Sequence, residues 1–127
     1  MRDIASNLGV VTALVPAVQA ATATSAAIDL LGFGSAAIVV HTGAIASAGN
    51  FTATVEESDA SGSGFAAVAA GDLVGAFSGV AVADAVEKVS YIGHKRYIRL
   101  VLTKNSGTSI AAAALVIKGN AETRPVA

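Results

Sequence analysis

Cysteine and tryptophan are absent from this 127-residue sequence, and charged residues make up only 13% of it. Without cysteine, the chain has no disulfide framework, no thiolate metal site and no cysteine nucleophile. No run of about 18 or more bulky apolar residues occurs, so a membrane-spanning helix is not expected. The formal net charge of −1 lacks the basic excess that is typical of nucleic-acid binders. We therefore expect neither a membrane nor a nucleic acid as a partner.

Hydrophobic residues, in contrast, make up 54% of the chain, and many of them are alanines, which bury little area. The chain has only four Phe and two Tyr, so few large side chains are present to build a dense core. A chain of this length is expected to form one domain. A lean core combined with so little surface charge predicts that neighbouring chains complete the structure, as in a homo-oligomer or a larger assembly.

Residues 91–104 are the most organised stretch of the sequence. They predict the end of one strand, a tight turn at 93–95 and a second strand over 96–104. Side chains alternate along a strand, so one face of the second strand is fully apolar while the other mixes polar and apolar residues. The apolar face carries Ile98, Leu100 and Leu102, and the mixed face carries Tyr97, Arg99, Val101 and Thr103. We interpret this stretch as a hairpin at the centre of the sheet.

Short strands separated by turn signals predict the rest of the fold. The expected strands cover residues 25–31, 36–45, 51–58, 65–69, 85–92 and 110–118. Residues 36–45 are apolar on both faces, which predicts an inner strand covered on both sides. Residues 111–114 are four alanines and alone would favour a helix, but the following Leu115, Val116 and Ile117 favour a strand. The pattern predicts an all-β fold, an antiparallel β-sandwich with the jelly roll as a candidate topology.

The first 24 residues are predicted to form an extended N-terminal arm, followed by the sandwich over 25–119 and a polar C-terminal tail over 120–127. The start of the chain has some features of a secretory signal, but Asp3 and Pro16 do not fit that pattern. A free arm would expose many apolar side chains to water, which indicates an association surface. We therefore predict partner contacts at Ile4, Leu8, Val11 and Leu14.

Residues that could act in catalysis or bind a metal are few, and their spacing fits no known site pattern. His41 and His94 are the only histidines, and they have no metal-ligand spacing. Glu56 and Glu57 are adjacent, so on a strand they point to opposite faces and cannot act as a paired acid and base. The acidic loop at 57–61 lacks an ordered calcium-binding pattern. We expect no enzymatic activity, no cofactor and no metal site.

Lys95, Arg96 and Arg99 form the one local cluster of basic residues. One interpretation is a set of solvated charges around a hairpin. The alternative is contact with an acidic patch on a partner protein, because arginine suits planar, multi-donor contacts. We predict these three residues as partner contacts.

Three segments resemble a family of small tailed-phage virion proteins, which are often encoded near the major capsid protein. The segments are Ile-Val-Val-His-Thr-Gly-Ala-Ile at 38–45, Val-Glu-Glu-Ser-Asp at 55–59 and Tyr-Ile-Gly-His-Lys-Arg-Tyr-Ile-Arg at 91–99. The resemblance runs from about residue 35 to residue 119 and does not cover the predicted arm. It implies a β-sandwich that decorates or cements the capsid by packing on the major capsid protein, located in the virion and in the host cytoplasm during assembly.

Two alternative functions remain open on the sequence. One is a tail or head-fibre component of the virion. The other is a carbohydrate-binding or surface-binding module that uses loops 58–64 and 105–108. Those loops lack the Trp or Tyr side chains that such sites usually present.

Overall fold

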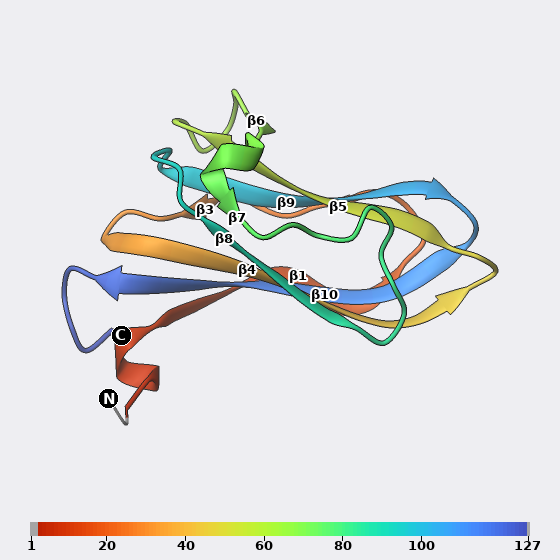
Figure 1. Cartoon of the computed structure of the whole chain (residues 1–127), viewed down its shortest axis with the longest axis horizontal. Helices are drawn as coiled ribbons and strands as arrows, with labels where there is room; N and C mark the ends of the chain where they lie inside the picture. The colour runs from red at the N-terminus through yellow and green to blue at the C-terminus, as the bar shows by residue number, and fades with distance from the viewer. Residues whose placement is uncertain (1–2, 127) are drawn as a thin grey trace.

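Two antiparallel sheets pack face to face in the computed structural model, which describes residues 3–126 (Figure 1). The first sheet has the strand order β1 (Gly9–Gln19), β10 (Ser109–Ala121), β4 (Phe33–Ala46), β8 (Val86–Tyr91) and β7 (Leu73–Val74). The second sheet has the order β2 (Ala23–Thr24), β9 (Tyr97–Ser106), β5 (Asn50–Ser58) and β6 (Ala66–Ala67), and β3 (Ile28–Asp29) also pairs with β9. Short 3-10 turns occur at η1 (Ala5–Asn7) and η2 (Ala70–Asp72).

The strand pairing is that of a jelly roll. The first long strand pairs with the last (β1 with β10), the next with the one before the last (β2 and β3 with β9), then β4 with β8 and β5 with β6. This nested pairing wraps four antiparallel pairs around one core and places alternate pairs in opposite sheets. The predicted all-β sandwich is confirmed, and its topology is the jelly roll.

The core lies between the two sheets and draws on both. Alternate positions of β4 and β10 point inward, as do the apolar positions of β9 and β5. The largest fully buried side chains are Phe51, Ile38, Ile98, Leu100, Leu102, Ile110, Val89 and Val116. Alanines occupy several other inward positions, so the core is lean, as the composition predicts. Among residues 3–126, every buried side-chain polar atom has a hydrogen-bond partner.

Three strand predictions are confirmed closely. Residues 51–58 lie within β5, where Phe51 and Val55 point into the core. Residues 36–45 lie within β4, and residues 110–118 lie within β10, so the four consecutive alanines form strand rather than helix. Cross-strand pairing with β1 and β4 on both sides decides this outcome, because tertiary pairing overrides weak local helix propensity.

The predicted hairpin over residues 91–104 is wrong, because its two strands do not pair with each other. Its first strand, β8, belongs to the first sheet and pairs with β4, whereas its second strand, β9, belongs to the second sheet and pairs with β5. The segment between them crosses from one sheet to the other. Gly93 fits this crossing because a Cβ there would lie 2.5 Å from the Tyr91 hydroxyl oxygen. A short turn between two strands looks the same in sequence whether the strands pair or separate.

The predicted arm over residues 1–24 is also corrected. Most of it is β1, which pairs with β10 along the edge of the first sheet, and residues 23–24 form β2 of the second sheet. The sandwich therefore begins at Gly9 rather than at residue 25, and it extends to Ala121 at its other end. The two described ends lie close together, since the Val126 amide donates to the Ser6 carbonyl (Figure 1). Residues 1–2 of the predicted arm and residue 127 of the predicted tail lie outside the described residues.

Candidate interaction surface

The side of the first sheet that faces away from the core, called here the outer face of the first sheet, is mostly apolar across four strands. Cross-strand register arranges its side chains in rows. The upper row holds Lys88, Val39, Leu115 and Thr12, and the middle row holds Val86, His41 and Ala113. The lower row holds Gly43, Ala111 and Val18, since Val18 pairs with Ala111 and a Cβ on Gly43 would meet the Ala111 Cβ at 3.3 Å.

Large apolar side chains on this face are open to solvent. Val10 is 62% exposed, Val18 69%, Val74 59%, Val86 64% and Leu115 36%. Contiguous apolar surface of this kind on a small protein marks an interaction site. The prediction that the strand over 36–45 is covered on both sides is therefore wrong for the isolated chain, because no layer formed by residues 3–126 lies over the outward side of β4.

The outer face of the first sheet is also hollowed. Two adjoining cavities of about 350 and 380 Å³ share Pro16, His41 and Ala113 in their walls. The second of them is floored by the small residues Gly43 and Ala111. The face therefore offers depressions into which side chains of a neighbour can fit.

The outer face of the second sheet is polar by comparison. Thr52 pairs with Thr103 across β5 and β9, and Thr54 pairs with Val101. Beside them the Arg99 guanidinium lies 2.6 Å from the Glu56 carboxylate and stacks over the Phe65 ring. Hydroxyl groups and a partly buried ion pair need no covering layer, so this face suits contact with water.

The free edge of β1 is interrupted. Its register with β10 shifts between Thr12 and Leu14 and again between Leu14 and Ala17, and Pro16 has no amide hydrogen to donate. Bulges and proline on an edge strand hinder pairing with another strand. The outer face, rather than this edge, is the better surface for association.

Each cation of the predicted basic cluster forms an ion pair with a carboxylate of the same chain. Lys95 pairs with Asp59 at 2.8 Å, Arg96 with Asp29 at 2.8 Å, and Arg99 with Glu56 at 2.6 Å. Sequence reasoning missed these pairs because the partners lie far apart along the chain. The pairs explain the basic cluster within the fold itself, and the predicted partner contact at these residues stays a prediction.

Direct hydrogen bonds change the pKa values of two side chains near the β8–β9 crossing. Hydrogen bonds from the Arg96 guanidinium, with a further one from the Leu31 amide, lower the pKa of Asp29 to about 2. Burial, together with donation of its hydroxyl to Glu57, raises the pKa of Tyr91 far above its usual range. The Tyr91 hydroxyl also accepts a hydrogen bond from the Lys95 amide. Charge and hydrogen bonding thus hold the β8–β9 crossing in place.

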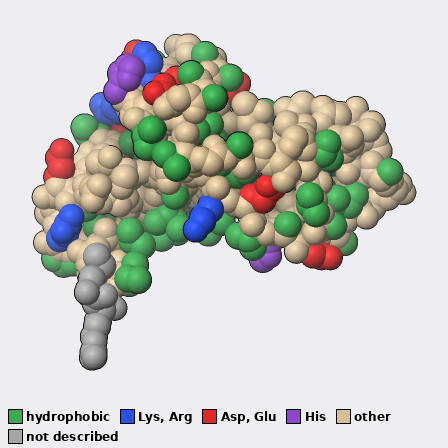
Figure 2. Space-filling model, viewed as in Figure 1, with side chains coloured by type: hydrophobic (Ala, Val, Ile, Leu, Met, Phe, Trp, Pro, Cys, Tyr) green, Lys and Arg blue, Asp and Glu red, His purple; other side chains and the backbone are tan. Residues whose placement is uncertain are grey.

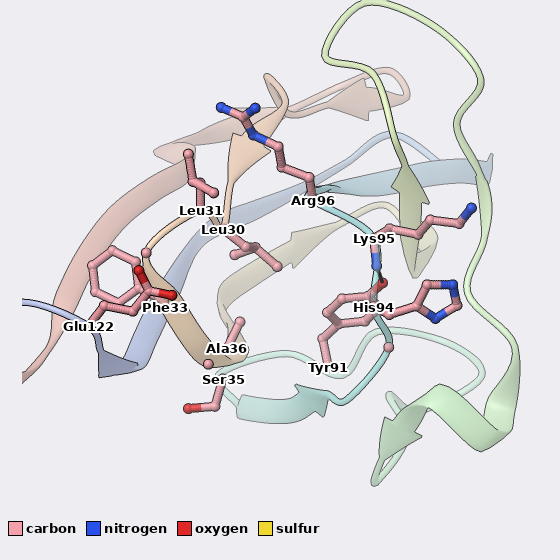
Figure 3. A pocket seen from close by; sticks show the side chains of 13 residues that line it. Leu30, Leu31, Phe33, Ser35, Ala36, Tyr91, His94, Lys95, Arg96 and Glu122 are labelled. Carbon is pink, nitrogen blue, oxygen red and sulfur yellow. Dashed lines mark hydrogen bonds between the residues drawn. The ribbon is translucent and has the colours of Figure 1, made fainter.

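A pocket of about 330 Å³ opens beside this crossing (Figure 3). Leu30 and Phe33 line one side and Tyr91 lies in its wall, while Arg96 and His94 contribute to its rim. Figure 3 shows the His94 ring directed away from Leu30. Two of the Arg96 nitrogens, Nε and Nη2, already donate to the Asp29 carboxylate at the edge of this pocket.

The predicted N-terminal contact residues separate into three groups. Leu14 is 7% exposed and belongs to the core, so its prediction as a partner contact is wrong: β1 pairs with β10 and turns this side chain inward. Leu8 and Val11 are half-buried. Ile4 is exposed before η1 and remains available to a neighbour.

His41 lies in the middle of the outer face of the first sheet and His94 at the β8–β9 crossing, so the fold does not bring them together. Within residues 3–126 no group of three or more His, Asp or Glu side chains is placed to hold a metal ion. Over the same residues, no helix has the length and apolar character needed to cross a membrane.

Lys and Arg side chains gather toward one end of the molecule, called here the charged end. Most of the Lys and Arg side chains visible in Figure 2 lie toward the left of the view, where the β8–β9 crossing is found in Figure 1. The opposite end carries the β4–β5 and β9–β10 turns, whose residues 47–49 and 107–108 are uncharged.

No protein-family model matches the sequence, and no curated protein matches it. Among solved structures, the chain is similar to one described as "Structure of infectious bursal disease virus Gx strain", with a TM-score of 0.45 and 15% sequence identity over 93% of this chain. This chain covers 33% of the length of that viral chain. A similarity of this strength carries no conclusion about the role of the protein.

Proposed function

We propose that this protein is a structural component of a tailed-phage virion, which decorates the capsid and stabilises it by packing on the major capsid protein and on neighbouring copies. The observation that carries the proposal is the apolar outer face of the first sheet. Its side chains are as apolar as those of a protein interior, but no layer formed by the described part of the chain covers it.

The resemblance of residues 38–45, 55–59 and 91–99 to small phage virion proteins supports the same role. Two of these three segments contribute to the candidate surfaces: residues 38–45 lie in β4, at the centre of the outer face, and residues 91–99 cross between the sheets at the charged end. Jelly rolls occur in viral capsid proteins, lectins and cupins, so the fold is compatible with the proposal without deciding it.

The mechanism we propose is mechanical. Covering apolar surface contributes about 25 cal/mol for each Å² removed from water. One contact of this size is weak, but a shell repeats it many times, and multivalent attachment raises the overall strength. Ile4 and the exposed charged end would contribute the contacts to the capsid lattice. The proposal includes no catalytic step, cofactor or nucleic-acid contact.

Particles assembled without this protein test the proposal. Heads that expand, leak or break under osmotic shock or heating, and that regain their strength when purified protein is added back, are the expected result. Normal heads that have lost their tails would instead assign the protein to the tail. Particles unchanged in both respects would contradict a structural role, and glycan binding by the isolated chain would then favour the surface-binding alternative.

A further inference from the structure

We infer that the neighbour covering the outer face of the first sheet is the same face of a second copy, related by a twofold axis that runs along the row Val86, His41 and Ala113. The axis lies parallel to the sheet and perpendicular to its strands, so each residue of this middle row faces its own equivalent. The inference rests on the proposed function only in taking this face to be covered by a neighbour. A twofold contact requires one patch to be complementary to itself, and the side chains meet that requirement in charge and in size.

Charge is the first match. Lys88 lies two residues after Val86 on β8, about 7 Å along the strand from the axis. Asp84 precedes β8 in a turn with a φ of 52°, and its amide donates to the carbonyl of Gly43 in the lower row, so Asp84 lies on the other side of the axis. Rotation about the middle row therefore brings Lys88 of each copy over Asp84 of the other. Both side chains are exposed, and within the described part of the chain neither forms an ion pair. The dimer would contain two such pairs.

Size is the second match. The same rotation places the upper row of one copy over the lower row of the other. Val39 then faces Gly43, and Leu115 faces Ala111. The largest side chains of the face thereby meet the depression floored by its smallest residues, as close packing requires. A single axis satisfies both matches.

The area available is sufficient for a weak dimer. β1, β10 and β4 each contribute about nine residues and β8 contributes six. At about 3.3 Å per residue and about 4.8 Å between strands, the face covers roughly 500 Å². Two such faces bury about 1,000 Å² in total, near the lower limit for a specific interface. Face-to-face packing of this kind also keeps the strands of the two copies aligned, which is one of the two usual arrangements of stacked sheets.

Sedimentation velocity of the purified full-length chain tests the inference, at concentrations from about 1 to 100 µM. The wild type should form a dimer. Val86→Glu would place two carboxylates against each other on the axis and should leave a monomer. The matched control is Val101→Glu, the same substitution at the centre of the outer face of the second sheet, and it should leave the dimer intact. Circular dichroism checks that each variant is folded.

A charge swap tests the axis itself. Lys88→Asp alone and Asp84→Lys alone should each raise the dimer Kd by about tenfold or more, because each creates two like-charge contacts. The double variant K88D/D84K restores both pairs and should return the Kd to within about threefold of wild type. Weak binding by the double variant, although it is folded, would overturn the proposed axis.

Failure of this inference can be told apart from failure of the proposed function. A wild-type chain that is monomeric at about 100 µM overturns the inference. If Val86→Glu then still prevents incorporation into particles, the face binds a different virion protein and the proposed function stands. A chain that dimerises through this face but is absent from particles would contradict the proposed function instead.

Discussion

The outer faces of the two sheets differ although both sheets contribute to one core. On the first sheet, positions that point outward from β4, β8 and β10 carry Val39, Val86 and Leu115. On the second sheet, the corresponding positions of β5 and β9 carry threonines and the Arg99–Glu56 ion pair. Antiparallel sheets commonly have one buried face and one solvated face. The second sheet follows that rule. The first sheet is mostly apolar on both faces, which indicates that its outer face is an interaction surface.

Replacement of a side chain inside the sandwich should have the largest effect. Phe51 is fully buried, so Phe51→Ala should lower the free energy of unfolding by about 3–5 kcal/mol through lost burial and a residual cavity. Val86→Ala on the outer face should change it by less than about 0.5 kcal/mol under dilute conditions. Urea denaturation measures both values. A loss above about 2 kcal/mol for Val86→Ala in the monomer would show that this side chain stabilises its own chain, and the contrast between interior and outer face would fail.

Charge placed on one outer face or the other should separate association from folding. Leu115→Glu should reduce incorporation into particles by about tenfold or more, because a carboxylate would be buried against an apolar neighbour. Thr54→Glu on the second sheet should incorporate normally. Quantitative gel analysis of purified particles gives the occupancy, and both variants should unfold near the wild-type temperature. Equal loss of incorporation for the two variants would remove the distinction between the faces.

The ion pair on the second sheet should have a smaller effect, confined to stability. Arg99→Ala removes the contact with Glu56 and the stacking over Phe65, and should cost about 1 kcal/mol. Lys88→Ala on the first sheet is the matched control, since Lys88 has no ion-pair partner among the described residues, and should cost less than about 0.5 kcal/mol. Similar losses for the two variants in urea denaturation would show that the Arg99 contacts contribute nothing specific.

The smallest predicted effect concerns Asp29 at the charged end. Its pKa is lowered from 3.8 to about 2 in the folded chain, so its charged form is favoured by folding. The stability that it contributes is complete above about pH 4 and is lost as the pH falls toward 2. Asp29→Asn should therefore be less stable than wild type at pH 5 and equal to it near pH 2. A difference that persists unchanged at pH 2 would show that another contact is responsible.

Local patterns in the sequence predicted much of the fold. Period-two alternation at 51–58 and β-branched residues at 36–45 identified strands, because the periodicity of a strand depends only on residues that are close in sequence. Pairing could not be obtained in this way. The jelly roll pairs β1 with β10 and β4 with β8 over long sequence separations, whereas the short link between β8 and β9 has the sequence pattern of a hairpin. Bulges and Pro16 interrupt the side-chain alternation of β1, so the sequence does not identify it as a strand.

The sequence predicted the apolar character of the candidate surface but not that this surface is exposed. The sequence of residues 36–45 is apolar on both faces and predicts cover on both sides, but it does not say which chain provides that cover. Which side of a strand faces the core, and whether another layer covers the other side, depends on the full set of strands. The ion pairs of Lys95, Arg96 and Arg99 were missed for the same reason, since their carboxylates lie 36, 67 and 43 residues away.

A side-chain-resolution map of the assembled particle tests the central claim most directly. The account predicts that, in every copy, Val86 and Leu115 lie within about 4.5 Å of apolar atoms of another chain, while Thr54 and Thr103 face solvent. A particle in which the outer face of the first sheet is in contact with water in all copies would contradict it.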